Sequence, residues 1–468
     1  MTQSLSDILA ASGNAVDLLR NSRIGMYVYP VVAPEFSNWR SEQMAWCKSA
    51  VLFDQSHHMD ELIVEGPDAK RFLEGLAINS FANFDTSRAK HYVPVTPSGH
   101  VIGDMIIFRE HEQKFVLVGR APTANWLRYN AWLGRHDVTL THDPRSPSRP
   151  DGKAVKRVHY RFQIQGPDAP KIFAQMNGGP VPDIPFFHVD WINAGQKRLQ
   201  ALRHGMAGAP GLEIWGPYDE KDEVHEIIVQ AAQRAGVDLH LVGARAYSTN
   251  TLESGWIPSP LPAIYTDDEL QGYRDWLTAD SYEATGSIGG SFVSRQIEDY
   301  YVNPYELGYG IYIKFDHEFV GRSALEAMRG KHHRKKVTFE WNAEDIMTVI
   351  ASNFVPGAEP YKWIDLPQPN YASSSADRVM MGDTIVGMSM FNGYSYNERC
   401  MLSLGVVDAR VQEGDVLTLI WGEPNGGTGK TSIEKGHRQA EIRVRVSPTP
   451  YGREARESYA ESWRTRRV

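Results

Sequence analysis

Cysteine is scarce in this chain of 468 residues, which contains only Cys47 and Cys400. Two thiols exclude a disulfide scaffold, an iron–sulfur cluster held by four thiolates and a Cys-rich zinc module. No run of 18 apolar residues occurs, so we expect no transmembrane helix. The first ten residues, MTQSLSDILA, lack a basic stretch followed by an apolar one, so we expect no secretory signal and a cytoplasmic protein.

A strong charge imbalance is also missing. Lys and Arg number 49 against 57 Asp and Glu, which gives a formal net charge of −8. This balance argues against binding to nucleic acid or to an anionic membrane surface as the main task. Tyrosine and tryptophan are plentiful, with 21 and 12 copies. Such side chains suit a site that grips flat rings, although the cores of large domains explain them equally well.

Two segments of the chain repeat one pattern. Residues 62–73 read LIVEGPDAKRFL and residues 162–173 read FQIQGPDAPKIF. In both copies a β-type run precedes Gly-Pro-Asp-Ala and an amphipathic stretch follows it. This pattern predicts a strand, a tight turn and a helix start, with Asp where the helix dipole favours negative charge. The repeat indicates two related α+β halves.

Other segments have recognisable periodicities. Residues 4–20 and 218–236 have the apolar spacing of helices, and residues 29–39 read as irregular. Residues 92–104 predict two strands around a Pro-Ser-Gly turn, and residues 106–119 predict a hairpin. The halves are therefore expected to mix helices with antiparallel strands.

The last third of the chain differs from the rest. It follows the basic run RGKHHRKK at 329–336, which is either a solvated linker or a patch for an acidic ligand. Short β-rich runs between turn residues then predict a separate all-β domain, a barrel or a sandwich. The runs are 337–341, 384–390, 401–407, 416–421 and 440–446. The expected domains are 1–150 and 151–330 for the two α+β halves and 331–468 for the β domain.

Polar groups gather in Asp54-Gln55-Ser56-His57-His58-Met59-Asp60, directly after a run expected to be a buried strand. Adjacent histidines on an extended chain point to opposite faces, and no HExxH motif or Cys pair supports zinc, so we predict no metal site. A histidine here is interpreted as an acid, a base or a hydrogen-bond orienter, or else as a structural residue. Which of His57 and His58 faces a site stays open.

The segment from Arg203 to Glu213 is rich in glycine. It lacks the Lys-Ser/Thr ending of a phosphate-binding loop and the context of a dinucleotide fingerprint. We interpret it as a tight loop that delivers Glu213 into a site, where the carboxylate suits a ring with adjacent N–H donors. Glycines that merely turn the chain are the alternative interpretation.

Tyr247 and Arg120 are further candidate site residues. A Tyr phenol is a competent proton donor when a nearby base tunes it, and a half-buried structural Tyr is the alternative. Arg120 follows the apolar strand FVLVG and either reaches a pocket or forms a surface ion pair. No nucleophile elbow, kinase motif set or nucleophilic triad is present in the sequence.

Taken in order, these segments resemble the folate-binding fold of the glycine-cleavage T protein. The resemblance covers nearly the whole chain. Within that superfamily the chain resembles the tetrahydrofolate-dependent aromatic O-demethylases, which act on vanillate and syringate. The matching stretches include NSRIGMYVYPVVAPEFSNWR, RHGMAGAPGLEIWGP and NTLESGWIPSPLPAIYT. The resemblance implies an α+β, three-lobed fold with a C-terminal β-barrel domain around a central channel.

The resemblance also implies roles for individual residues. Tyr247 and His58 are the implied catalytic residues, and Glu213 and Trp256 would bind the pterin. The aromatic substrate would lie against Tyr29, Gln55, His58, Arg120 and Tyr247. Ser248-Thr249 stand where the vanillate enzymes carry Pro-Ser, a change compatible with a doubly methoxylated ring.

The implied reaction moves a methyl group from a lignin-derived methoxybenzoate to N5 of tetrahydrofolate, giving 5-methyltetrahydrofolate. The best candidate is syringate, which would give 3-O-methylgallate; vanillate and 3-O-methylgallate are alternatives. An aminomethyl or sulfonium-methyl transferase and a non-catalytic folate-binding protein are further alternatives. The expected partners are the small aromatic substrate and folate, with no obligatory protein partner.

Overall fold

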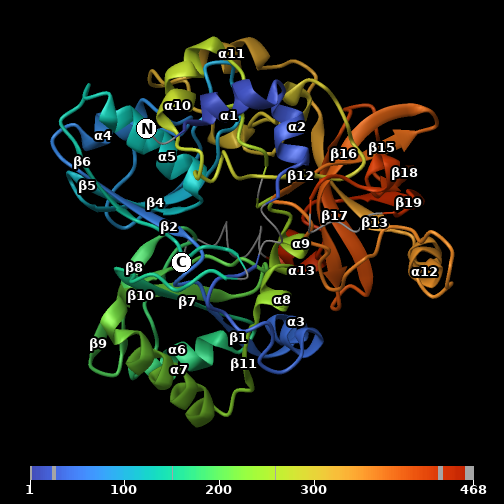
Figure 1. Cartoon of the computed structure of the whole chain (residues 1–468). Helices are drawn as coiled ribbons and strands as arrows, with labels where there is room; N and C mark the ends of the chain where they lie inside the picture. Colours follow the sequence, from blue (N-terminus) through green and yellow to red (C-terminus); the bar gives the residue numbers. More distant parts are fainter. Residues whose placement is uncertain (1–2, 24–27, 150, 259, 431–435, 459–468) are drawn as a thin grey trace.

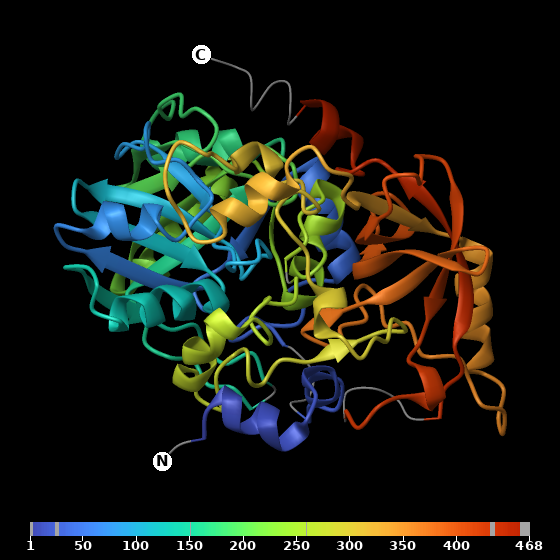
Figure 2. The ribbon, with the colours of Figure 1, turned by 90° about the horizontal axis from the view of Figure 1, so that it is seen from above.

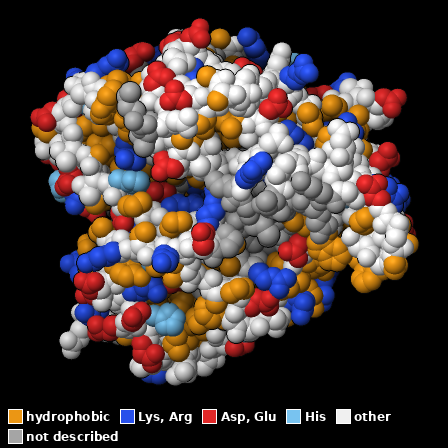
Figure 3. Space-filling view, in the orientation of Figure 1, with side chains coloured by type: hydrophobic (Ala, Val, Ile, Leu, Met, Phe, Trp, Pro, Cys, Tyr) orange, Lys and Arg blue, Asp and Glu red, His pale blue; other side chains and the backbone are white. Residues whose placement is uncertain are grey.

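The computed structural model of the chain describes residues 3–458 apart from 24–27, 150, 259 and 431–435. Two lobes built on β-sheets lie one above the other, and a β-barrel lies beside them (Figure 1). Seen from above, a yellow-green segment separates the first lobe from the barrel (Figure 2). Lys and Arg side chains are interspersed with Asp and Glu on the face in Figure 3. The two lobes built on β-sheets and the barrel beside them confirm the predicted α+β fold with a C-terminal barrel.

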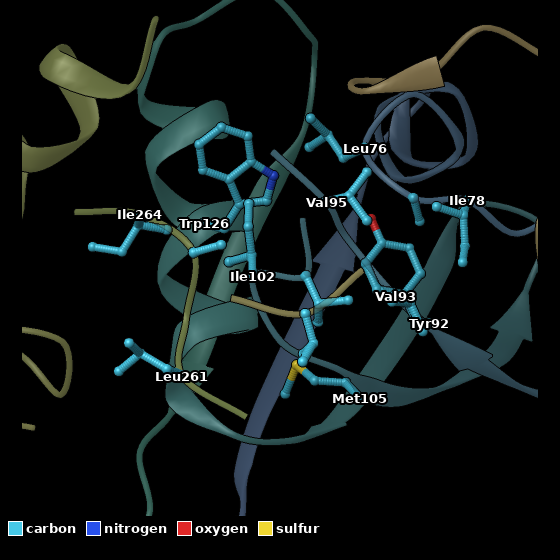
Figure 4. Close-up of a cluster of buried hydrophobic side chains, with 14 of the residues drawn as sticks. Leu76, Ile78, Tyr92, Val93, Val95, Ile102, Met105, Trp126, Leu261 and Ile264 are labelled. Carbon is cyan, nitrogen blue, oxygen red and sulfur yellow. The ribbon is translucent and has the colours of Figure 1, made fainter. Parts of the chain in front are cut away.

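The first lobe holds an antiparallel sheet of five strands in the order β3-β4-β5-β2-β6. The predicted hairpin is present as β4 and β5. Trp126, Met105 and Leu261 belong to the core beside this sheet, which Figure 4 shows. The elements are β2 Asp60–Glu65, α4 Ala69–Glu74, β3 Ala89–Tyr92, β4 Met105–His111, β5 Lys114–Gly119, α5 Ala121–Trp132 and β6 Thr139–Asp143.

The second lobe holds six strands in the order β11-β1-β7-β10-β9-β8, and α6 and α7 pack against this sheet to form the core. Strand β1 belongs to the first predicted segment of the sequence yet pairs with β7 and β11 of the second. The domain boundaries at 150 and 330 stay a prediction. The elements are β1 Ala50–Asp54, β7 His159–Gln165, α6 Ala169–Asn177, β8 Val189–Ala194, β9 Lys197–Leu202, β10 Gly211–Pro217, α7 Lys221–Ala235 and β11 Leu239–Leu241.

The repeated Gly-Pro-Asp-Ala segments have the same structure in both lobes. Each joins a strand to a helix, β2 to α4 and β7 to α6. Gly66 and Gly166 have φ of 138° and 126°, where a side chain would be strained. A Cβ on either glycine would lie about 2.5 Å from a carbonyl oxygen, that of Asp137 or Ser49. Glycine is therefore required at both turns.

The helical periodicity of residues 4–20 corresponds to two helices instead of one. Gly13 takes a left-handed φ of 72° and ends α1 (Leu5–Ser12), and the Asn14 side chain caps α2 (Ala15–Arg20). The remaining helices of the core are short: α3 Trp39–Lys48, α8 Ala244–Tyr247, α9 Asn250–Ser254, α10 Gln271–Trp276 and α11 Arg322–Met328. The described residues also form the 3-10 turns η1 Tyr218–Glu220, η2 Asp268–Leu270, η3 Ile297–Tyr300, η4 Gly310–Tyr312 and η5 Pro424–Gly426.

The C-terminal lobe is a closed barrel with the strand order β13-β17-β16-β15-β18-β19. The five β-rich runs of the sequence lie in β13, β16, β17, β18 and β19. Its elements are β13 Lys335–Trp341, α12 Ala343–Ser352, β15 Asp377–Met381, β16 Thr384–Ser395, β17 Cys400–Val407, β18 Val416–Trp421, β19 Ala440–Ser447 and α13 Arg453–Ser458; β14 Ser374–Ser375 pairs with β12 Ile288–Gly289 outside it. Within the described ranges, no helix has the length and apolar character needed to cross a membrane.

Candidate active site

The three lobes enclose a cavity of about 620 Å³, a size that suits small ligands. Its wall includes parts of β3 and β4 from the first sheet, β10 from the second, α8 and α9 between them, and β16 of the barrel. All but one of the predicted site residues line it, namely Tyr29, His58, Arg120, Glu213, Tyr247 and Trp256. The predicted residues from distant parts of the sequence therefore meet in one cavity.

A Tyr–His pair lies in this cavity. The Tyr247 hydroxyl is 2.7 Å from His58 Nε2, and the Tyr29 ring lies 4.5 Å from the Tyr247 ring and 5.1 Å from the His58 ring. Burial, reinforced by the charges of Arg145 and Arg120, lowers the pKa of His58 well below its usual 6.5. The imidazole is therefore neutral at pH 7.

Because the imidazole is neutral, the hydrogen bond between the two rings can run in either direction. Either Tyr247 donates to Nε2 and Nδ1 carries the ring proton, or Nε2–H donates to the phenol oxygen. His58 Nδ1 is buried and has no hydrogen-bond partner in the described part of the chain. In the second arrangement, the Tyr247 O–H points away from His58, where the Met206 sulfur lies 3.6 Å away, and can turn to a ligand in the cavity.

The two adjacent histidines have different surroundings. His57 lies outside the cavity wall, where Nδ1 is 3.0 Å from Ser146 Oγ and Nε2 is 2.8 Å from the Tyr218 hydroxyl. His58 faces the cavity. Residues 56–58 form a turn instead of the extended chain that the sequence suggested, and the turn separates the two rings.

Arg120 and Gln55 occupy different positions relative to the cavity. Arg120 precedes α5, lines the wall and has its Nη1 3.5 Å from the Tyr282 hydroxyl. Gln55 is buried and is not part of the wall. Its Nε2 is 2.9 Å from Gln163 Oε1 and 3.1 Å from the Met206 sulfur, which does line the cavity. Direct contact of Gln55 with the aromatic substrate stays a prediction.

Glu213 and Trp256 supply an acceptor and a flat ring to the wall. Glu213 is 3% exposed, and its Oε1 accepts from Arg161 Nη1 at 2.8 Å. Within the described residues, Oε2 accepts no hydrogen bond and is not fully buried, so it can accept one from an N–H of a ligand. The Trp256 indole N–H donates to Asp104 at 3.2 Å and to the Tyr309 hydroxyl at 3.0 Å, which fixes the ring. A buried carboxylate acceptor beside an aromatic ring fits a pterin.

The sequence did not single out the group around Asp104. This buried carboxylate accepts hydrogen bonds from His91 at 2.8 Å and Tyr309 at 2.9 Å as well as from Trp256. Burial alone would raise its pKa, but these bonds and the His91 charge lower it, so Asp104 is ionised. Asp104 had appeared only as the end of a predicted strand. No cluster of three metal-binding side chains occurs among residues whose placement is described.

Comparison with known proteins identifies the class. Residues 21–259 match the family model of the GCVT N-terminal domain. The chain belongs to this family, and it is a methyltransferase-type enzyme, as the sequence predicted. Tetrahydrofolate is the one-carbon acceptor of the family, and the cavity residues fit its pterin ring.

Individual relatives are similar over most or all of the chain. Syringate O-demethylase of Sphingobium sp. strain SYK-6 is 48% identical over the full length of both proteins. Sesamin methylene transferase of Sinomonas sp. is 30% identical over 83% of this chain and 82% of that protein. The aminomethyltransferase T structure from Bartonella henselae has a TM-score of 0.58 at 16% identity, covering 96% of this chain and 98% of that one, and supports the fold.

Proposed function

We propose that this protein is a tetrahydrofolate-dependent O-demethylase whose main substrate is syringate, with 3-O-methylgallate as the product. The Tyr247–His58 pair at 2.7 Å, inside a cavity that also holds Arg120 and Glu213, is the observation that carries the proposal. The 48% identical relative named syringate O-demethylase supports the choice of substrate. The aromatic acid and folate are the proposed small-molecule partners.

The chemistry requires help at the leaving oxygen. An aryl methyl ether is a poor electrophile because a phenolate must leave when the methyl–oxygen bond breaks. Tetrahydrofolate supplies N5, the amine that accepts the methyl group, and the N5 proton balances the one given to the leaving oxygen. Holding the two reactants in line contributes roughly 7–11 kcal/mol to lowering the barrier. The protein must therefore position the reactants and protonate the phenolate.

Tyr247 and His58 carry out the proton step in this proposal. The electron pair of the breaking bond goes to the ether oxygen, which takes the Tyr247 proton. His58 Nε2–H donates to the Tyr247 oxygen and stabilises its negative charge until the proton returns. A positioned acid of this kind accelerates a reaction by about 10²–10⁴-fold.

Arg120 and Tyr29 orient the ring of the substrate. The guanidinium of Arg120 carries a fork of donors that suits a carboxylate or adjacent ring oxygens. Tyr29 supplies an aromatic wall beside His58 and Tyr247. Glu213 and Trp256 hold the pterin on the other side of the reacting groups. A sulfonium substrate needs no acid at its leaving group, so Tyr247 would be dispensable for it.

The test incubates the purified protein with tetrahydrofolate and syringate under anaerobic conditions. Mass spectrometry should detect 3-O-methylgallate and 5-methyltetrahydrofolate in equal amounts, and neither product without folate. Vanillate and 3-O-methylgallate are run in parallel, and the highest kcat/KM identifies the main substrate. Absence of folate-dependent demethylation with all three substrates would contradict the proposal.

A further inference from the structure

A polar network lies behind Glu213 on the second sheet. Arg161 and Gln163 of β7 share one sheet face with Glu213 and Trp215 of β10, because Glu213 is opposite Gln163 and Trp215 is opposite Arg161. The intervening residues turn toward α6 and α7 and join their hydrophobic core. The face with Arg161 therefore points toward the first lobe and the cavity.

Arg161 joins two buried carboxylates. Its Nε lies 2.6 Å from Glu61 Oε1, and its Nη1 lies 2.8 Å from Glu213 Oε1. Glu61 Oε2 is in turn 2.7 Å from His159 Nδ1. The side chains of Arg161 and Glu61 are each 2% exposed, so water screens these charges poorly. One guanidinium thus serves two carboxylates, only one of which reaches the cavity.

The aromatic side chains around Arg161 restrict its position. The guanidinium lies 4.8 Å from the Trp215 ring centre and 5.4 Å from that of Phe108, which belongs to the first sheet. Both rings interact favourably with a cation. The fork of donors is therefore held between the sheets at the point where it meets Glu61 and Glu213.

The two carboxylates share the cation unequally. Glu61 has both Arg161 and His159, and these outweigh burial and lower its pKa to about 2. Burial raises the pKa of Glu213, Arg161 opposes this rise, and the negative charge of Glu61 adds to it. Glu61 therefore competes with Glu213 for the positive charge that keeps Glu213 ionised.

We propose that Arg161 is a positioning residue that holds Glu213 as a carboxylate for pterin recognition, and that Glu61 limits this effect by sharing the guanidinium. The inference rests on the proposed function, because it assumes that Glu213 accepts hydrogen bonds from the pterin. Folate binding should then weaken at low pH, where Glu213 takes up a proton. We call this loss of folate affinity toward low pH the acid limb of binding. Removing Glu61 and removing Arg161 should shift the limb along the pH axis in opposite directions.

Other titratable groups near Glu213 define the usable pH range. His204 lines the same cavity, and burial lowers its pKa to about 4, so it stays neutral above pH 5. His159 contacts Glu61 Oε2, whereas Arg161 contacts Glu61 Oε1. His91 and Asp104 form their own pair in the cavity wall. Because every variant keeps these groups, a difference between two variants in the range pH 5 to 8 reports on Glu213 and its network.

The experiment measures the Kd of tetrahydrofolate alone by anaerobic calorimetry across this pH range. Wild-type binding should weaken toward low pH, approaching about tenfold per pH unit, as expected for uptake of one proton. Glu61→Gln keeps an acceptor for Arg161 and should move the limb to lower pH, with about threefold or greater tightening at pH 5. Glu65→Gln is the matched control on β2, because the Glu65 side chain is 45% exposed and pairs with Lys114 instead of Arg161. Its limb should stay at the wild-type position.

Arg161→Gln should move the limb to higher pH and weaken binding at pH 7 by about tenfold or more. If this variant does not fold, Arg161→Lys replaces it and should give a weaker Kd with a smaller upward shift. If the Glu61→Gln variant still binds folate but its limb lies at the same pH as that of wild type, or at higher pH, the inference is overturned. Failure of wild type to bind tetrahydrofolate at any pH would instead overturn the proposed function.

Discussion

Replacing Tyr247 by Phe tests the proton donor through the loss of one oxygen atom. The ring is 5% exposed, packs edge-on against Phe53 at 5.3 Å and lies beside Tyr29 at 4.5 Å, and Phe keeps these contacts. The missing atom is the one that lies 2.7 Å from His58 Nε2. Substrate should therefore still bind, and the loss should fall on kcat because the interaction is made chiefly in the transition state.

The expected magnitudes separate catalysis from stability. Loss of a general acid should lower kcat by about 10²-fold or more, near 2.7 kcal/mol, with KM changed by less than about threefold. The mutation also leaves a buried nitrogen of His58 without its partner, which costs about 1–3 kcal/mol of unfolding free energy. The variant should therefore melt at a lower temperature and yet remain folded in the assay.

A matched control is available at the neighbouring histidine. Tyr218→Phe also removes a Tyr–His hydrogen bond, that of 2.8 Å to His57, but this pair lies outside the cavity wall. Its kcat should stay within about twofold of wild type. A series of methoxybenzoates with increasingly acidic leaving phenols then completes the assay. Tyr247→Phe should harm the more acidic members less, whereas equal losses across the series, or a raised KM with intact kcat, would refute proton donation.

The pterin site, the substrate anchor and the buried imidazole each give a further prediction. Glu213→Gln turns one acceptor oxygen into a donor and should weaken tetrahydrofolate binding by about 1.5–3 kcal/mol in calorimetry. Unchanged affinity would remove Glu213 from the pterin site. Arg120→Lys keeps the charge but loses the planar fork, so kcat/KM for syringate should stay about tenfold or more below wild type. Full activity would show that a point charge suffices or that Arg120 is not at the site. Because burial and nearby Arg charges lower the pKa of His58 well below 6.5, kcat should stay level as pH falls from 8 to about 6.5. An acid limb in kcat centred at or above pH 6.5 would contradict a neutral His58.

The parts of the fold that depend on local interactions were predictable from the sequence. Gly66 and Gly166 each stand at a turn that only glycine tolerates, and the flanking strand and helix have their own periodicities, so the repeat was visible. The helix boundary at Gly13 was missed because the apolar spacing continues across it. A glycine in a helical pattern either sits inside a helix or ends it, and the left-handed φ of 72° that decides the matter comes from the folded backbone.

The candidate site divides in the same way. The types of side chain were recognisable at Tyr247, Glu213 and Arg120, and the resemblance to aromatic O-demethylases supplied Tyr29 and Trp256. The residue pattern alone did not show whether His57 or His58 faces the cavity, because the rule of alternating faces holds for an extended chain and this segment is a turn.

The partners of the cavity residues lie far away in the sequence, and this separation explains what sequence analysis missed. Asp104 bonds Tyr309 and Trp256, which are 205 and 152 positions further along the chain, and Arg161 bonds Glu61 across 100 positions. A buried charge is tolerated only with such partners, so the tertiary structure had to supply a partner for each of these charged groups. The pattern around Asp104 or Arg161 in the sequence resembles that of an ordinary strand residue. Only the assembly of the two sheets and the α8–α9 segment brings the carboxylates, the guanidinium and the indole together, and the chemistry of the cavity depends on that assembly.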